Sequence, residues 1–292
     1  MTDNSHDIKR FNLTEGKVWA VDKPLGWTSF QVVKKLRGAL LVRARQAGVR
    51  KLKVGHAGTL DPLASGVMLI CVGRATKTID QLQAGVKEYV ATIRLGATTP
   101  SFDLETPVDA TYPTEHITRE LIDATLPQFV GTISQIPPAY SACKVEGERA
   151  YFAARHGLEV ELKPKTLVID SISVEDFNPE EMLLTIRVVC SKGTYIRALA
   201  RDIGQSLGSG AHLAALRRTR VGDYSIDDCL DIDGAMTDIV ESEIEVSLPD
   251  SKEPFIIAPA KYTPSSPSNT HISKVNSPRN IKIHSSHETL TV

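Results

Sequence analysis

The pattern of hydrophobic and polar residues changes its period several times along the chain. Several segments have the pattern of a β-strand. Residues 67–72, Val-Met-Leu-Ile-Cys-Val, form a continuous apolar run closed by Gly73, which is typical of a buried strand. Residues 88–95 alternate between apolar and polar positions, and residues 18–21 form a shorter apolar run. Two longer extended segments, residues 167–176 and 182–190, flank the turn residues Asn178 and Pro179. That arrangement predicts a β-hairpin.

Helical spacing of apolar residues occurs in other segments. A helix capped by Thr28 or Ser29 is predicted to run to about residue 41, and a basic, irregular segment follows at residues 43–53. Further helices are predicted for residues 75–84, for residues 118–128 behind the N-cap Thr118, and for residues 148–156. Apolar residues at 196, 199, 203 and 207 predict a helix that Gly208 ends, and residues 210–218 are interpreted as a basic turn or short helix.

Residues 55–66 stand out between these elements because they combine loop formers with ionisable side chains. The segment reads Gly-His-Ala-Gly-Thr-Leu-Asp-Pro-Leu-Ala-Ser-Gly, so His56 and Asp61 lie among three glycines and a proline. A shaped loop before a core strand is a common place for chemistry. Asp-Pro is also a common turn opener, and a lone histidine is often only solvated. Local composition leaves both interpretations open.

Charge is distributed unevenly, although the net charge is only −1. Residues 17–100 carry fourteen basic and four acidic side chains, a net charge of +10, and residues 187–224 carry a net charge of +5. Residues 225–256 reverse the sign, with ten acidic residues against Lys252. Such asymmetry indicates a face that binds a polyanion, either a nucleic acid or a phosphorylated ligand, although a solvated helix surface explains part of it.

Length and composition limit the class of protein. A chain of 292 residues with 41% hydrophobic content can bury a core as one large domain or two smaller ones. Because it contains neither an apolar run of about 18 residues nor a secretory signal, we expect a cytoplasmic protein without a membrane span. Its four cysteines are widely spaced and form no Cys-x-x-Cys pair, so no metal and no disulfide framework are predicted. We expect a monomer.

The two ends of the chain differ from its middle. Residues 1–16 form a polar leader, and residues 262–292 are more than half Ser, Thr, Pro and Asn. We therefore predict that a folded domain covers residues 17–249 and that residues 250–292 are a low-complexity, disordered tail.

Four segments, in order and approximate spacing, closely resemble the bacterial tRNA pseudouridine-55 synthase B family. They are Asp22-Lys-Pro-Leu-Gly-Trp-Thr-Ser29, the segment 55–66, Ile136-Pro-Pro-Ala-Tyr-Ser-Ala142 and Cys190-Ser-Lys-Gly-Thr-Tyr-Ile-Arg197. The match covers about residues 17–230. The resemblance implies an α+β pseudouridine synthase fold, with a central, mostly antiparallel mixed sheet flanked by helices and loops. It also implies a thumb insertion at about residues 141–162.

The same resemblance implies the reaction and the residues that serve it. The family isomerises uridine 55 in the T loop of tRNA to pseudouridine, without a cofactor or metal. By motif, Asp61 matches the catalytic aspartate and Arg197 the arginine that pairs with it. Tyr89 matches the tyrosine that stacks on the target uracil, and His56 the histidine that fills the space of the flipped base. The remaining matches are Tyr195 and Leu213 in the uracil pocket and Lys23 in the first motif.

The chain departs from the family pattern at its C-terminus, and this keeps alternatives open. Many members continue into a small RNA-binding domain, whereas this chain has an acidic segment and a polar tail. A synthase acting on another RNA stem-loop, or a non-catalytic RNA-binding or chaperone protein, therefore remains an alternative. A phosphate-binding hydrolase has little support because the Gly-x-x-x-x-Gly-Lys-Ser/Thr motif is absent.

Overall fold

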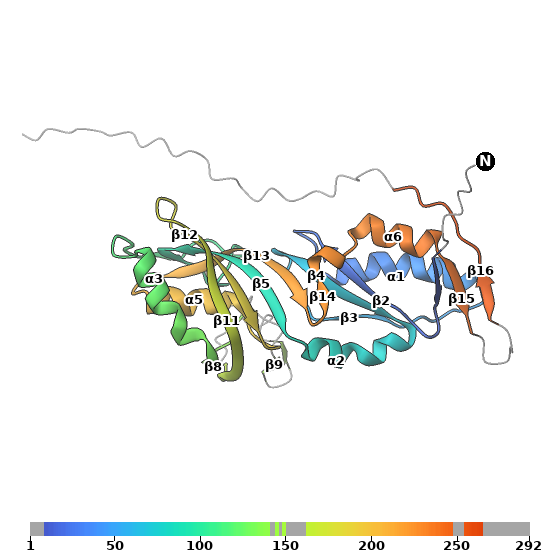
Figure 1. Ribbon diagram of the computed structural model, residues 1–292, viewed down its shortest axis with the longest axis horizontal. Coiled ribbons are helices and arrows are strands. Elements are labelled where there is room, and N and C mark those ends of the chain that lie inside the picture. Colours follow the sequence, from blue (N-terminus) through green and yellow to red (C-terminus); the bar gives the residue numbers. More distant parts are fainter. Residues whose placement is uncertain (1–8, 141–143, 146–147, 150–161, 248–253, 265–292) are drawn as a thin grey trace, which may run out of the picture. The chain divides into compact units, whose positions relative to one another are not determined.

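The computed structural model describes residues 9–140, 144–145, 148–149, 162–247 and 254–264 (Figure 1). Its contacts divide the chain into two compact units, residues 1–262 and 263–292. The strands and helices of the described residues all lie in the first unit. Most of the predicted thumb, residues 141–162, falls outside the described residues, as does the tail from residue 265.

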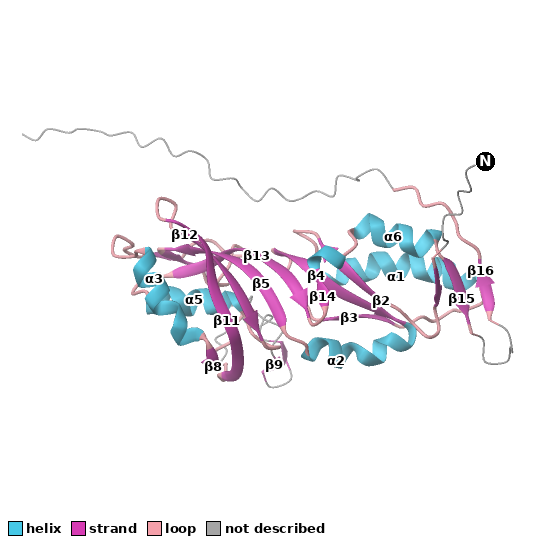
Figure 2. Cartoon of the chain, in the orientation of Figure 1, coloured by secondary structure: helices cyan, strands magenta, loops and turns pink. Residues whose placement is uncertain are grey.

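A nine-stranded mixed sheet forms the centre of the first unit (Figure 2). The main strand order is β2-β4-β13-β5-β12-β11-β8, with β3 beside β4 and β14 beside β13. All pairs are antiparallel except β4 with β13. The strands are β2 (Val18–Lys23), β3 (Val54–Ala57), β4 (Ala64–Val72), β5 (Lys87–Leu95), β8 (Gly131–Gln135), β11 (Lys165–Asn178), β12 (Leu183–Cys190), β13 (Ala211–Val221) and β14 (Tyr224–Ser225). The predicted α+β class with a mostly antiparallel mixed sheet is confirmed.

Helices pack against this sheet. They are α1 (Ser29–Gln46), α2 (Ile79–Ala84), α3 (Arg119–Thr125), α5 (Ile196–Ser206) and α6 (Ile232–Glu241), with 3₁₀ turns at Gly73–Thr78, Leu126–Phe129 and Ile226–Asp228. Smaller sheets pair β1 (Arg10–Asn12) with β15 (Glu243–Val246) and β16 (Phe255–Ile257), β6 (Ala97–Thr98) with β7 (Ala110–Thr111), and β9 (Lys144–Val145) with β10 (Glu148–Arg149). Thr28 caps α1 through a capping box with Gln31, as its sequence favours.

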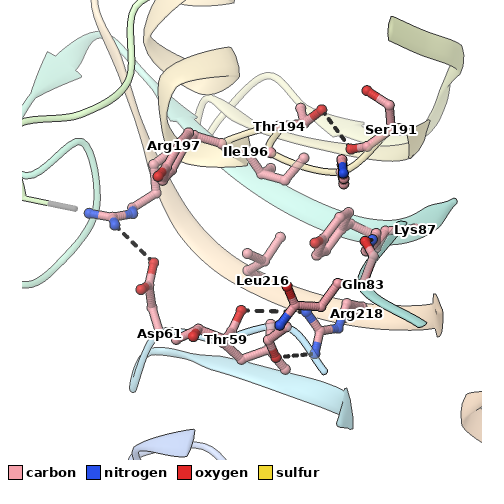
Figure 3. A pocket seen from close by; sticks show the side chains of 16 residues that line it. Thr59, Asp61, Gln83, Lys87, Ser191, Thr194, Ile196, Arg197, Leu216 and Arg218 are labelled. Atoms are coloured by element: carbon pink, nitrogen blue, oxygen red, sulfur yellow. Dashed lines mark hydrogen bonds and ion pairs between the residues drawn. The ribbon is translucent and has the colours of Figure 1, made fainter. Parts of the chain in front are cut away.

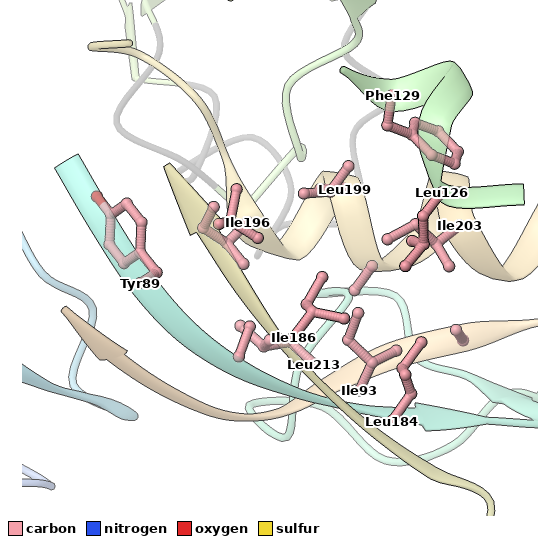
Figure 4. Close-up of a cluster of buried hydrophobic side chains, with 14 of the residues drawn as sticks. Tyr89, Ile93, Leu126, Phe129, Leu184, Ile186, Ile196, Leu199, Ile203 and Leu213 are labelled. Carbon is pink, nitrogen blue, oxygen red and sulfur yellow. The ribbon is translucent and has the colours of Figure 1, made fainter. Parts of the chain in front are cut away.

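The buried side chains form two large clusters. One packs α3 and α5 against β5, β12 and β13, and includes Ile93, Ile186 and Leu199 (Figure 4). The other packs α1 and α6 against β2 and β4 and includes Leu36, Met68 and Ile239. The apolar stripes predicted for α1 and α5 are buried. The Asp61 loop, which precedes β4, and α5, which packs beside β13, both contribute to the first cluster, through Leu60 and Leu199.

Several local predictions were wrong, and strand pairing explains most of them. Residues 211–218 belong to β13 because a basic segment can form a strand when its neighbours β4 and β5 supply hydrogen bonds on both sides. Residues 55–57 pair with β4 as β3 instead of joining the loop. The helix α1 runs on to Gln46 through the segment expected to be irregular. Residues 148–149 form β10, while the rest of the helix predicted at 148–156 lies outside the described residues.

Two strands lie in regions predicted to be a leader and a tail. β1 falls within residues 1–16 and pairs with β15, and β16 falls beyond residue 249 and pairs with the same strand. The three-stranded sheet lies over the second hydrophobic cluster, to which it contributes Ile244, Val246 and Ile257. The compact unit thus extends past the expected boundary, to Tyr262.

Candidate active site

The loop that carries Asp61 connects β3 to β4 and is held from outside. The hydroxyl of Ser29, at the start of α1, accepts a hydrogen bond from the Leu60 amide and donates one to the Leu60 carbonyl, both at 2.9 Å. The Gly26 amide donates to the carbonyl of Pro62 at 2.8 Å. Hydrogen bonds from Ser29 and Gly26 thus hold the residues on both sides of Asp61. They fix the backbone position from which the Asp61 carboxylate projects.

Arg197, in the first turn of α5, meets this carboxylate. Its guanidinium nitrogen Nη2 lies 3.0 Å from Oδ2 of Asp61, and Nη1 lies 3.5 Å from Oδ2 of Asp103. The same group donates to the carbonyls of Ser101 at 3.1 Å and Tyr140 at 2.9 Å. The Arg197 side chain is only 5% exposed. A buried guanidinium with this many partners has one available position, which orients Asp61.

The pKa of Asp61 reflects opposing effects. Partial burial raises the pKa of this carboxyl group above its usual value, and the neighbouring charge of Arg197 lowers it. The negative charges of Asp103 and Glu105 raise it further. Arg197 therefore favours the ionised form in a site that otherwise favours the protonated one.

Asp61 and Arg197 face a cavity of about 530 Å³ (Figure 3). This volume is in the range of pockets that bind small ligands. The residues that line it include Asp61, Lys87, Tyr89, Tyr195, Arg197, Leu216 and Arg218. Among the described residues that line the cavity, Asp61 is the only carboxylate.

Tyr89 and Tyr195 are the predicted aromatic residues that line this cavity. Tyr89 projects from β5, is 9% exposed, and lies at the margin of the buried cluster (Figure 4). Tyr195 immediately precedes α5, and the Gln135 side chain holds its backbone by accepting from its amide at 2.9 Å and donating to its carbonyl at 3.2 Å. The structure therefore brings four predicted site residues, Asp61, Arg197, Tyr89 and Tyr195, around one space.

Leu213 borders a different space. It is 5% exposed and lines a small neighbouring cavity of about 10 Å³ together with Asp61, Asp103 and Arg197. Leu216, three residues further along β13, lines the large cavity. Residues 210–218 were predicted to be a turn or short helix. That prediction could not show which of the two leucines of the strand β13 lines the large cavity.

Lys23 and His56 do not line the large cavity. Lys23 is fully buried, donates to the carbonyls of Pro24 at 3.0 Å and Trp27 at 2.6 Å, and has its pKa lowered to about 8, mainly by burial. His56 lies in β3, and burial likewise lowers its pKa. The charges of Asp61 and Lys23 interact, so Lys23 stabilises the Asp61 loop without lining the cavity.

Three further polar residues at this site were not found from the sequence. Asp103 is the second carboxylate on Arg197. Lys87 and Arg218 are buried cations that line the cavity, with 6% and 2% exposure. The basic charge of residues 187–224 was a signal for Arg218, but it could not show which arginine turns inward.

Neither a membrane-spanning helix nor a metal site occurs among the described residues. No helix among them is long and apolar enough to cross a membrane. Within the same residues, no cluster of three or more His, Cys, Asp and Glu side chains has the arrangement of a metal site.

Comparison with known proteins gives consistent matches. A family model described as "TruB family pseudouridylate synthase (N terminal domain)" matches residues 45–196, and one described as "tRNA pseudouridylate synthase B C-terminal domain" matches residues 197–242. The chain is 61% identical over 234 residues to tRNA pseudouridine synthase B of Phocaeicola vulgatus, covering 80% of this chain and 97% of the relative. It is 62% identical over 236 residues to that of Bacteroides fragilis, covering 81% and 99%.

Solved structures show the same fold. A chain in the structure entitled "Crystal Structure of a Cbf5-Nop10-Gar1 Complex" matches with a TM-score of 0.57 and 29% identity, over 77% of this chain and 55% of that chain. A chain of an "H/ACA RNP bound to a substrate RNA containing 2'-deoxyuridine" matches with a TM-score of 0.54 and 28% identity, over 77% and 54%. Together with the family models and the close relatives, these matches show that the chain belongs to the TruB family of pseudouridylate synthases.

Proposed function

We propose that this chain isomerises uridine to pseudouridine in tRNA, at position 55 of the T loop, with Asp61 as the catalytic carboxylate. The observation that carries the proposal is the ion pair of 3.0 Å between Asp61 and the buried Arg197 at the wall of a cavity of about 530 Å³. The close relatives named tRNA pseudouridine synthase B support the tRNA substrate.

The reaction needs a single ionised carboxylate. It breaks the N1–C1′ bond of uridine, turns the uracil and joins C5 to C1′, and no water enters the product. Glycoside hydrolysis generally uses two carboxyl groups at the substrate, about 5 to 10 Å apart. Here the second carboxylate, Asp103, contacts Arg197 but does not line the large cavity. The arrangement therefore favours an isomerase over a hydrolase.

Arg197 and Asp103 support the ionised state and position of Asp61. Arg197 provides the opposite charge that a carboxylate requires in a partly desolvated site. Asp103 is 6% exposed and holds the other guanidinium nitrogen, so it fixes the direction in which Arg197 presents its charge. Both are positioning residues in this proposal.

The cavity suits one nucleotide turned out of a folded RNA loop. Such extrusion costs a few kcal/mol of stacking, and contact with an aromatic ring recovers about 1 to 3 kcal/mol per base. Tyr89 lines this space together with Leu216 and Tyr195, which supports its proposed role of stacking on the uracil. His56 does not line it, so its insertion into the space of the flipped base would require the RNA to reach β3.

We further propose that the enzyme acts as a monomer in the cytoplasm and that its basic face holds the RNA backbone. Lysine and arginine side chains that neutralise phosphates give salt-dependent binding. The segment 17–100 supplies much of this charge, with a net charge of +10.

The test is incubation of the purified chain with unmodified tRNA, followed by mapping of pseudouridine. We expect modification at position 55 by the wild type and none by Asp61→Asn. In cells that lack the protein, an unmodified position 55 is expected. A wild type that binds the tRNA without converting it would support the non-catalytic alternative, and conversion only of another stem-loop would support a different substrate.

A further inference from the structure

Arg218 is a buried arginine whose charge the proposed mechanism has not used. It projects from β13, and its Nε donates to the carbonyl of Val67 at 2.7 Å. Its terminal nitrogens contact the carbonyls of Gly58 at 3.2 Å and Thr59 at 3.5 Å, just before Asp61 (Figure 3). The side chain therefore connects β4, the catalytic loop and the cavity.

Close approach of β4 and β13 makes this position possible. Gly66 of β4 has a φ of 108°, and a Cβ atom there would lie 2.1 Å from the carbonyl oxygen of Arg218. Only glycine allows both the backbone angle and this contact. The last glycine of the segment 55–66 thus brings Arg218 against the loop that carries Asp61.

Arg218 has partners, but they do not neutralise it. A guanidinium has five N–H groups, and three are directed at backbone carbonyls. Burial raises the pKa of the Tyr89 hydroxyl, and the nearby charge of Arg218 lowers it. Within the described residues, none of the ion pairs formed by carboxylates involves Arg218. Its positive charge therefore remains at the cavity wall.

Lys87 adds a second cation to the same wall. It is 6% exposed, and its Nζ donates to the carbonyl of Gly85 at 2.6 Å and to that of Gln83. Burial lowers the pKa of Lys87, and the charge of Arg218 lowers it further, which indicates that the two groups lie close together. The cavity thus has a positive side formed by Arg218 and Lys87.

The proposed reaction places negative charge on the pyrimidine. Breakage of the C1′–N1 bond leaves the electron pair on the ring, spread over N1, O2 and O4. Addition of a carboxylate at C6 instead shifts electrons of the C5–C6 double bond toward O4. Formation of the C5–C1′ bond uses this charge. Removal of the C5 proton by a base then returns negative charge to the ring until N1 takes up a proton. A fixed positive charge in a partly desolvated site stabilises such a state.

We propose that Arg218 stabilises the negative charge that develops on the uracil ring and positions the Tyr89 ring that stacks on it. This inference rests on the proposed function. Arg218 donates to the backbone before Asp61, and it lines the same cavity as Tyr89. It is a positioning residue that also supplies charge, in contrast to Arg197, whose charge is engaged by Asp61.

The experiment compares two tRNA substrates that carry uridine or 5-fluorouridine at the target position. Fluorine withdraws electrons and stabilises the ring anion, so the fluorinated substrate depends less on Arg218. Because its C5 carries no proton to lose, the assay on both substrates follows breakage of the N1–C1′ bond and formation of the C5–C1′ bond. We expect Arg218→Gln to reduce the single-turnover rate of uridine rearrangement by about 100-fold and that of 5-fluorouridine by roughly ten-fold. Arg218→Lys, which keeps the charge, is expected to recover part of the uridine rate.

Arg217→Gln is the matched control because it changes the adjacent residue of β13 at a place away from the cavity. Arg217 pairs with Asp22 at 2.8 Å and does not line the cavity. It should leave the ratio of the two substrate rates unchanged. Equal losses on both substrates with Arg218→Gln, or a lysine variant no better than the glutamine variant, would show a purely structural role.

A second variant keeps the inference testable if Arg218→Gln does not fold. Tyr89→Phe retains the buried ring but loses the hydroxyl on which the charge of Arg218 acts. It should slow uridine rearrangement by roughly ten-fold and 5-fluorouridine rearrangement by less. Identical effects on both substrates would overturn the inference. A wild-type protein that forms no pseudouridine would instead overturn the proposed function.

Discussion

Two buried arginines on different sides of the cavity differ in what neutralises them (Figure 3). Arg197 lies between Asp61 and Asp103, so its charge is used within the protein. Arg218 donates to three backbone carbonyls, so its charge remains available to a ligand. The comparison indicates that two arginines at one cavity can serve two different purposes. In the proposed reaction, Arg197 holds the Asp61 carboxylate in place, and Arg218 stabilises the negative charge that forms on the substrate.

Removal of the Asp61 charge should have the largest effect on the rate. Asp61→Asn keeps the size of the side chain but eliminates the charge that Arg197 holds, and we expect turnover to fall by about 10⁴-fold or more. Affinity for the tRNA should change little. Single-turnover assays together with filter binding measure both quantities, and substantial conversion by this variant would exclude Asp61 from the mechanism.

Removal of the Arg197 charge should have the second-largest effect on the rate. Arg197→Gln is expected to lower the rate by roughly 10²- to 10³-fold. Without the guanidinium the pKa of Asp61 rises further, so activity should be lost at a higher pH as the solution becomes more acidic. A pH–rate profile checks the direction, and an unchanged acidic limb would contradict the role assigned to the ion pair.

The second carboxylate on Arg197 gives a smaller effect with the opposite pH shift. Asp103→Asn removes a negative charge that raises the pKa of Asp61, so the acidic limb should move to lower pH. The rate should drop by roughly ten- to 100-fold because Arg197 loses one of the groups that orient it. If the limb instead moves to higher pH, Asp103 does not act through the charge of Asp61.

Replacement of Lys23 should have the smallest effect, and that effect concerns the stability of the folded protein. Its pKa is lowered from 10.5 to about 8 in the folded protein, so between these pH values the unfolded chain binds more protons. The free energy of unfolding contributed by this group should therefore rise with pH over that window, by at most about 3 kcal/mol. Chemical denaturation of wild type and Lys23→Met across this range measures the difference.

The exposed Lys34 of α1 offers the control for that experiment. Lys34→Met should run parallel to the wild type over the same pH window, since other titrating groups are common to both proteins. A Lys23→Met protein with the same pH slope as the wild type would show that Lys23 is charged in the folded state throughout.

Much of the fold could be predicted from periodicity. The strand β4, the hairpin of β11 and β12, and the helices α1 and α5 follow from local apolar patterns and caps. β13 could not be recognised because its basic and apolar residues fit a turn or a short helix equally well. Its character is set by β4 and β5 on either side.

The candidate site divides in the same way. By motif resemblance the sequence predicted Asp61, Arg197, Tyr89 and Tyr195, and the structure places all four at one cavity. It could not place Asp103, Lys87 or Arg218, because their contacts depend on β5, β13 and the loop after β6. It also could not distinguish Leu213 from Leu216, since that choice depends on strand register.

The sequence by itself determined the family motifs, the main helices and strands, and which side chains could carry the chemistry. Only the tertiary structure decided which charges are neutralised and which are left free, because that depends on contacts between residues far apart in the chain. Asp61 and Arg197 are separated by more than a hundred positions, yet their atoms lie 3.0 Å apart once β4 and β13 pair in parallel.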